Sequence, residues 1–123
     1  MLLDTQVLLW RMSGARRLRD SARDEIQAAE ELLVSVVSFI EIGVKASVGK
    51  LTIPKELYDR TTDSGARILG LTPEHGLGVA ALPLHHRDPF DRLLISQARH
   101  ERLSIVTADP QFAAYDVPVV AAT

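Results

Sequence analysis

The sequence predicts a single α/β domain with a mainly parallel sheet of four or five strands between helices. Short apolar runs alternate along the chain with segments of helical periodicity, which is the pattern of β-α units. A chain of 123 residues can bury the core of one domain. No repeat, low-complexity stretch or linker divides it, so residues 1–123 are predicted to fold as one unit.

Five short apolar segments are predicted to be the strands. The first is the pair Leu2-Leu3, and the second is rich in valine, a residue that favours strands. The predicted strands are residues 2–3, 32–37, 68–71, 104–107 and 117–120. Right-handed crossovers leave few topologies for such a sheet.

The segments between these strands carry signals for helix ends. Ser38 followed by Glu41 has the form of a capping box, and Gly49 suits a helix end. Pro89 fits the first position of a helix, which makes Asp88 its N-cap. The predicted helices are residues 5–12, 18–31, 38–49, 55–67, 72–81 and 88–102.

The composition excludes several classes of protein. Without cysteine, the chain has no disulfide, zinc-thiolate site or cysteine nucleophile, which is consistent with a cytoplasmic protein. We find no signal peptide and no apolar run of the roughly 20 residues that cross a bilayer, so no membrane association is expected. The net charge of −2 argues against a nucleic-acid partner, unless bound cations neutralise a group of acids.

Arginines are concentrated near the N-terminus. They are Arg11, Arg16, Arg17, Arg19 and Arg23. Such a run is usually the solvated face of a helix, but it could also bind phosphates, and the sequence leaves both interpretations open.

Acidic residues are predicted to converge at one edge of the sheet. Asp4 ends the first strand, Glu41 lies in the first turn after the second, and Asp109 follows the strand at 104–107. The helix that starts near Asp91 could bring this residue to the same edge. Ligands bind at the carboxyl ends of the strands in such sheets.

A cluster of carboxylates needs a counterion, because the charges repel each other and burial raises the cost. Hard divalent cations such as Mg²⁺ or Mn²⁺ prefer oxygen ligands and can activate a water for attack on phosphorus. Thr5, Ser38 and Thr107 add hydroxyl groups beside three of the acids, as outer partners of the ligands.

Four segments of the chain carry a family resemblance. They are Leu-Leu-Asp4-Thr-Gln-Val-Leu-Leu-Trp, Ser38-Phe-Ile-Glu41-Ile, His-Arg-Asp88-Pro-Phe-Asp91-Arg-Leu-Leu-Ile and Val-Thr107-Ala-Asp109. In order and spacing they resemble the signature segments of PIN-domain ribonucleases, and more narrowly those of VapC-type toxins of toxin–antitoxin pairs. The resemblance implies an Mg²⁺- or Mn²⁺-dependent endoribonuclease that forms a homodimer and binds a cognate antitoxin.

The resemblance also assigns residues. Asp4, Glu41, Asp91 and Asp109 match the four acids of the family, and Asp88 is left as the helix cap with an outer-shell duty. Among the arginines, Arg11, Arg87 and Arg92 are candidates for RNA contacts. The chain departs from the family at Gln6, where His or Asn is common, and in lacking the residues that usually precede the first strand.

Two alternatives from other classes remain at this stage. A phosphoacceptor or phosphatase-like α/β module also collects acids at strand ends, but it uses a lysine late in the chain, and no lysine follows Lys55. A non-catalytic RNA-binding relic of the same fold would be expected to have lost an acid. Cleavage of DNA as well as RNA is left open.

Overall fold

The computed structural model describes residues 1–14 and 17–123 and contains one five-stranded sheet. Its strands are β1 (Leu2–Leu3), β2 (Leu33–Ser35), β3 (Arg67–Leu69), β4 (Ile105–Thr107) and β5 (Val119–Ala121). Their order is β3-β2-β1-β4-β5, and each neighbouring pair is parallel. The predicted parallel α/β fold is therefore confirmed. Arg16, one of the clustered arginines, lies outside the described residues.

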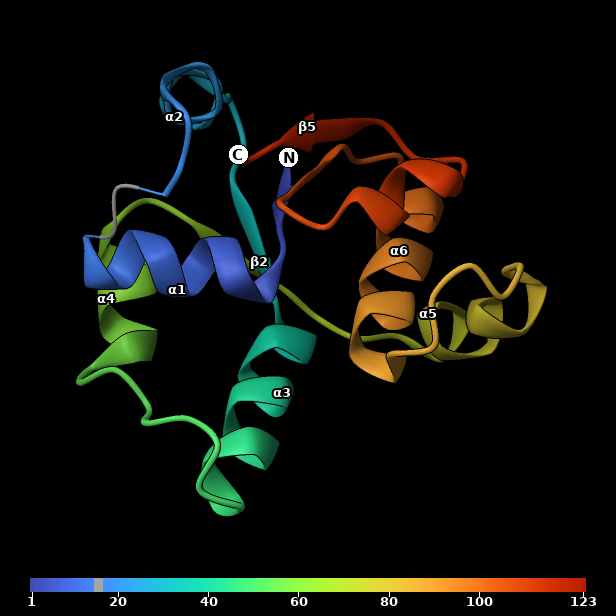
Figure 1. Cartoon of the computed structure of the whole chain (residues 1–123), viewed down its shortest axis with the longest axis horizontal. Coiled ribbons are helices and arrows are strands. Elements are labelled where there is room, and N and C mark those ends of the chain that lie inside the picture. Colours follow the sequence, from blue (N-terminus) through green and yellow to red (C-terminus); the bar gives the residue numbers. More distant parts are fainter. Residues whose placement is uncertain (15–16) are drawn as a thin grey trace.

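Helices cover both faces of this sheet. They are α1 (Thr5–Ser13), α2 (Asp20–Ala28), α3 (Val36–Ser47), α4 (Leu57–Asp63), α5 (Pro73–Gly78) and α6 (Pro89–Glu101), with short 3₁₀ helices η1 (Val79–Ala81) and η2 (Pro110–Ala114). Figure 1 shows α1 and α4 on one side of the strands, α5 and α6 on the other, and α3 extending away from the end of β2. Within the described part of the chain, no helix has the length and hydrophobicity of a transmembrane segment.

Alternation along the strands divides the core into two layers. In β1, Leu2 packs in the cluster that contains Leu94 and Ile95 of α6, whereas Leu3 packs in the cluster that contains Val7 and Leu8 of α1. β2 and β4 alternate in the same way, because successive side chains of a strand point to opposite faces. The central strands are buried on both faces, which explains why they read as unbroken apolar runs.

The boundary between β2 and α3 differs from the prediction. The strand ends at Ser35, which caps α3 by accepting a hydrogen bond from the Val37 N–H at 3.0 Å. Ser38 is thus already inside the helix, and the predicted capping box of Ser38 and Glu41 is wrong. Apolar residues at the start of a buried helix look like a continuing strand, since short apolar runs carry no distinguishing period.

Other elements are shorter than predicted. The helices expected at 18–31 and 55–67 are α2 and α4, and Gly65, with φ +92°, turns the chain from α4 into β3. A capping box does occur at the start of α5, where Thr72 and His75 bond to each other's backbone N–H groups. The predicted start of α6 is confirmed, with Asp88 as N-cap and Pro89 at the first position.

Candidate active site

Carboxylates from four separate segments line one cavity of about 400 Å³. Asp4 directly follows β1, and Asp109 lies two residues after β4, so both lie at the carboxyl edge of the sheet. Glu41 comes from α3 and Asp91 from the first turn of α6. The structure therefore brings together all four acids that the sequence singled out, and Asp88 lines the same cavity.

Asp4 is almost completely buried, with a relative exposure of 6%. Its Oδ1 accepts a hydrogen bond from the Val7 N–H at 2.8 Å, so it also caps α1, a role the sequence analysis missed. Its Oδ2 accepts a hydrogen bond from the Thr107 hydroxyl. Burial raises the pKa of Asp4 to about 6, and repulsion from Glu41 and Asp109 adds to the rise against these two hydrogen bonds.

Glu41 is buried, with a relative exposure of 4%, and among the described residues its carboxylate has one hydrogen-bond partner. Its Oε2 accepts a hydrogen bond from Lys45 Nζ at 2.5 Å, one turn further along α3. Its Oε1 is the one buried side-chain N or O atom without a hydrogen-bond partner among residues 1–14 and 17–123. A buried carboxylate oxygen without a donor is costly, so this atom marks a place where a cation would be favourable.

Asp91 and Asp109 share a single partner, His86. The Nε2 of His86 lies 2.9 Å from Asp91 Oδ2 and 2.9 Å from Asp109 Oδ2. Burial raises the pKa of Asp91 to about 7, with further repulsion from Asp88, while the nearby His86 lowers it. His86 thus joins two of the four acids, a role that no motif in the sequence indicated.

The proton of His86 can be placed from its second hydrogen bond. The Asp88 N–H donates to Nδ1 at 3.1 Å, so Nδ1 offers a lone pair and the proton of the neutral ring is on Nε2. His86 therefore donates to Asp109 Oδ2, and the same N–H lies 2.9 Å from Asp91 Oδ2. Asp88 uses its own Oδ1 to accept from the N–H groups of Phe90 and Asp91, as expected of an N-cap.

The sequence model of one protein family, described as the PIN domain, matches residues 1–118 of this chain. The chain belongs to the PIN-domain family. It is 30% identical over 120 residues to Ribonuclease VapC22 of Mycobacterium tuberculosis, covering 95% of this chain and 92% of that protein. The resemblance to VapC-type PIN domains that the four segments indicated is confirmed.

Solved structures share the fold of this PIN domain. A toxin–antitoxin complex from Klebsiella pneumoniae matches with a TM-score of 0.69 at 20% identity, covering 99% of this chain and 97% of that chain. VapBC2 from Rickettsia felis, bound to a promoter DNA fragment, matches with a TM-score of 0.71 at 14% identity. The match covers 98% of this chain and 96% of that chain. At these identities the likeness concerns the fold.

The donor set of the PIN-domain cavity fits a hard divalent cation. The lining carboxylates offer oxygen ligands, which Mg²⁺ and Mn²⁺ prefer, and no thiolate is present in the chain. The raised pKa values of Asp4 and Asp91 show how poorly the cavity tolerates its own negative charge without a cation. Together with the unpartnered Glu41 Oε1, these features indicate that the residues present suit such an ion.

The hydroxyl groups expected beside the acids divide into two kinds. Thr107 bonds to Asp4 and also accepts from the Asp109 N–H at 3.0 Å, so it links two of the acids. Thr5 instead donates to the Ser38 hydroxyl at 2.9 Å, a buried link between α1 and α3. The hydrogen bonds of Thr5 and Ser38 thus join helices beneath the cavity, and they reach no carboxylate.

Arg92 does not lie where a substrate contact would require it. Its guanidinium is buried and donates to backbone carbonyls of the segment that precedes α6 and to the Tyr115 hydroxyl. The carbonyls belong to Val79, Leu82, Pro83 and His86. The structure gives no support to the expected RNA contact of Arg92, because both terminal nitrogens donate inward to this segment and to Tyr115.

The other candidate arginines lie at the margin of the site. Arg87 is exposed next to Asp88. Arg11 lines a neighbouring cavity of about 360 Å³ between α1 and α2, and burial lowers its pKa. Trp10 lines both this cavity and the acid cavity, and Arg17 lies over the Trp10 ring, 6.0 Å from its centroid.

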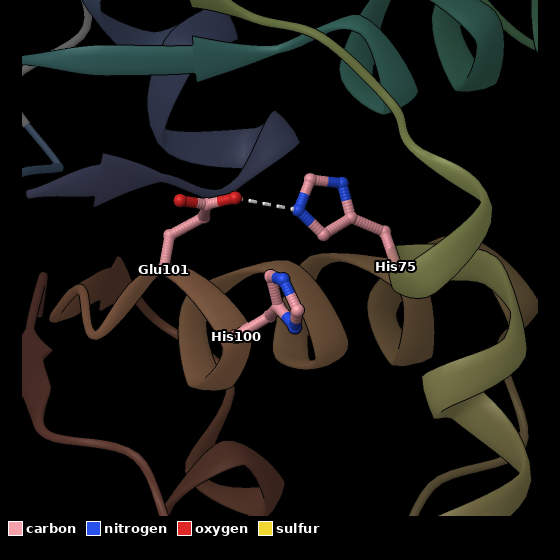
Figure 2. A group of neighbouring side chains, drawn as sticks. All are labelled: His75, His100 and Glu101. Carbon is pink, nitrogen blue, oxygen red and sulfur yellow. Dashed lines mark hydrogen bonds and ion pairs between the residues drawn. The ribbon is translucent and has the colours of Figure 1, made fainter.

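A second group of potential ligands lies away from the acids, where α5 meets the end of α6. Figure 2 shows His75 directed at Glu101, with the ring of His100 standing edge-on nearby. His75 Nδ1 accepts from the Thr72 N–H at 3.0 Å, so Nε2 carries the proton that it donates to Glu101 Oε1 at 2.9 Å. Nδ1 thus closes the capping box of α5 and Nε2 ties α5 to α6, so the group is structural.

Proposed function

We propose that this PIN domain is an Mg²⁺- or Mn²⁺-dependent endoribonuclease and the toxin of a toxin–antitoxin pair. The observation that carries the proposal is the convergence of Asp4, Glu41, Asp91 and Asp109 on one cavity in which a buried carboxylate oxygen lacks a partner. The sequence relative is named as a ribonuclease, which supports RNA as the substrate.

The acids would hold the ion, and the ion would supply an activated water and stabilise the leaving oxygen. The chain's own contribution is to fix the carboxylates before RNA arrives. Thr107 orients Asp4, and His86 holds Asp91 and Asp109 together. Preorganised ligands need no rearrangement during the reaction, which favours turnover.

RNA contacts are proposed along the rim of the acid cavity. Trp10, Gln6 and Arg17 line it beside the acids, so an indole face and a guanidinium are available to a base and a phosphate. Arg11 and Arg23 line the adjacent cavity and could continue the path of the backbone. Gln6, the departure from the family pattern, lies at this rim and leaves the four acids intact.

The decisive assay is incubation of the purified protein with labelled single-stranded RNA and DNA, in Mg²⁺, in Mn²⁺ and in EDTA. Cleavage of RNA that needs metal supports the proposal. Absence of cleavage with intact metal binding would favour the non-catalytic alternative. The PIN-family match removes the receiver-like alternative, whose late lysine this chain lacks.

An antitoxin is proposed to bind an apolar surface on α3 and the segment that follows it. Ile40, Val44 and Val48 are exposed along α3, and next to them Ile53 and Tyr58 line a groove of about 340 Å³ with Phe39 and Ile42. An amphipathic helix could place its apolar face in such a groove. Several of the structural neighbours are toxin–antitoxin complexes, which supports this kind of partner.

A homodimer is proposed as the state of the free protein, because large apolar side chains are also exposed around α5. Leu71, Leu77 and Leu84 are the residues concerned. Sedimentation of the wild type and of a Leu77→Glu variant tests this proposal: a dimer that the charge converts to a monomer supports it. A wild type that sediments as a monomer at micromolar concentration contradicts it.

A further inference from the structure

Lys45 places a fixed positive charge inside the acid cavity. It lies one turn after Glu41 on α3, and its ammonium group lines the cavity together with Asp4, Asp91 and Asp109. The ion pair with Glu41 is short, 2.5 Å from Nζ to Oε2, and the Glu41 side chain is buried. The charges of Asp88 and Asp91 also act on this ammonium. Lys45 is therefore held by the same acids that would bind a metal ion.

Most of the carboxylate oxygens in the cavity already accept a hydrogen bond from the protein. The bonded oxygens are both of Asp4, both of Asp109 and Oε2 of Glu41, and Asp91 Oδ2 lies 2.9 Å from His86 Nε2. In the part of the chain that the structure describes, this leaves Glu41 Oε1, Asp91 Oδ1 and, on the cap residue Asp88, Oδ2 without a protein donor. Glu41 Oε1 belongs to the carboxylate that pairs with Lys45, and Asp91 Oδ1 belongs to the carboxylate that lies against His86.

We propose that the Lys45 ammonium group acts as a resident cation in place of a second metal ion, so that the cavity binds one divalent ion and not two. The inference rests on the proposed function, because it assumes that the acids bind metal. Its physical reason is that an ammonium on Glu41 repels a second dication at short range. In a partly buried site this repulsion is several times stronger than in water.

A resident ammonium also has a consequence for the free protein. It offsets part of the repulsion among the acids when no metal is bound, and it cannot diffuse away as a metal ion can. Glu41 is then the acid whose charge is already paired, whereas Asp4 and Asp91 carry the raised pKa values. The divalent ion is therefore expected to be bound mainly by Asp4, Asp91 and Asp109. Glu41 would contribute its free Oε1 as a further ligand.

The test is the number of Mn²⁺ ions bound per chain, measured from the loss of the free-ion electron paramagnetic resonance signal during a titration. Wild type should bind one ion. Lys45→Met keeps the length of the side chain but not its charge, and it should bind two ions, the first more tightly by about tenfold. Lys45→Arg restores the charge and should bind one. Lys50→Met, an exposed lysine outside the cavity, is the matched control and should also bind one.

The outcomes separate this inference from the proposed function. Two ions in wild type, or one ion in a folded Lys45→Met variant, would overturn the role of Lys45 while leaving the metal site intact. Absence of any Mn²⁺ binding by wild type would overturn both. A circular dichroism melt of each variant shows whether it is folded.

Discussion

Neutralising Asp91 should stabilise the metal-free protein. The Asp91→Asn variant removes a charge that burial and Asp88 make unfavourable, and the amide keeps an oxygen that can lie against the His86 ring nitrogen. The gain should appear in EDTA, where no metal ion offsets the charge. Such a trade-off between stability and activity is expected at functional sites.

The size of the effect follows from the pKa of Asp91, which is raised from 3.8 to about 7. At pH 8 this costs the folded protein about 4 kcal/mol, because each tenfold change in proton affinity is worth about 1.4 kcal/mol. The Asp91 side chain is 21% exposed, and solvent screening reduces the cost to about 2 kcal/mol. For a domain of this size the Tm of the variant should rise by about 8 °C.

The sign of the pH dependence follows from the same values. Below pH 3.8 Asp91 is protonated in both states of the wild type, so the substitution brings no electrostatic gain. Between pH 3.8 and about 7 the unfolded state loses its proton first, and the penalty on the folded wild type grows. The advantage of Asp91→Asn should therefore increase over this range and level off above it.

The assay is a series of thermal melts in EDTA from pH 4 to pH 8, followed by circular dichroism. Asp24→Asn on the exposed face of α2 is the control, and its Tm should match wild type at each pH. If Asp91→Asn melts at or below the wild-type Tm at pH 8, the carboxylate is not under electrostatic strain. An equal gain at pH 4 and pH 8 would show that the effect is not one of charge.

The other predictions concern catalysis, metal and the role of the cap. Asp4→Asn should reduce RNA cleavage by several orders of magnitude with the fold intact, and the products of the wild type should carry 5′-phosphate and 3′-hydroxyl ends; undiminished cleavage by the variant would refute the assignment of Asp4. Mg²⁺ at a hundredfold excess over its Kd should stabilise wild type by about 2.7 kcal/mol, whereas identical melts with and without millimolar metal would exclude a metal site. Asp88→Ser keeps a capping oxygen, so it should cost under about 1 kcal/mol in denaturant unfolding and retain substantial cleavage, while Asp91→Asn should abolish it. The reverse result would mean that the two roles are exchanged. Expression in a bacterial host should slow growth until the antitoxin is supplied; harmless expression of a protein that cuts RNA in vitro would indicate a housekeeping nuclease instead.

Local signals in the sequence were sufficient to predict the fold and to single out the four acids that line the cavity. Alternation of apolar runs with helical segments predicted the parallel sheet, and Asp88-Pro89 predicted the start of α6. These features depend on residues close together in the sequence, such as a cap and the turn it closes. Carboxyl ends of parallel strands meet at one edge, so the approach of Asp4 and Asp109 could be predicted as well.

The partners of the acids were decided by the tertiary structure. His86 joins Asp91 and Asp109 because the loop before α6 folds back over the end of β4, and no spacing in the sequence indicates this. Arg92, next to Asp91 in the sequence, points the other way and binds carbonyls. Lys45 lines the cavity because packing places α3 beside Asp4 and Asp91. Hydrogen bonds between distant segments depend on the packing of helices on the sheet, and packing is a property of the whole chain.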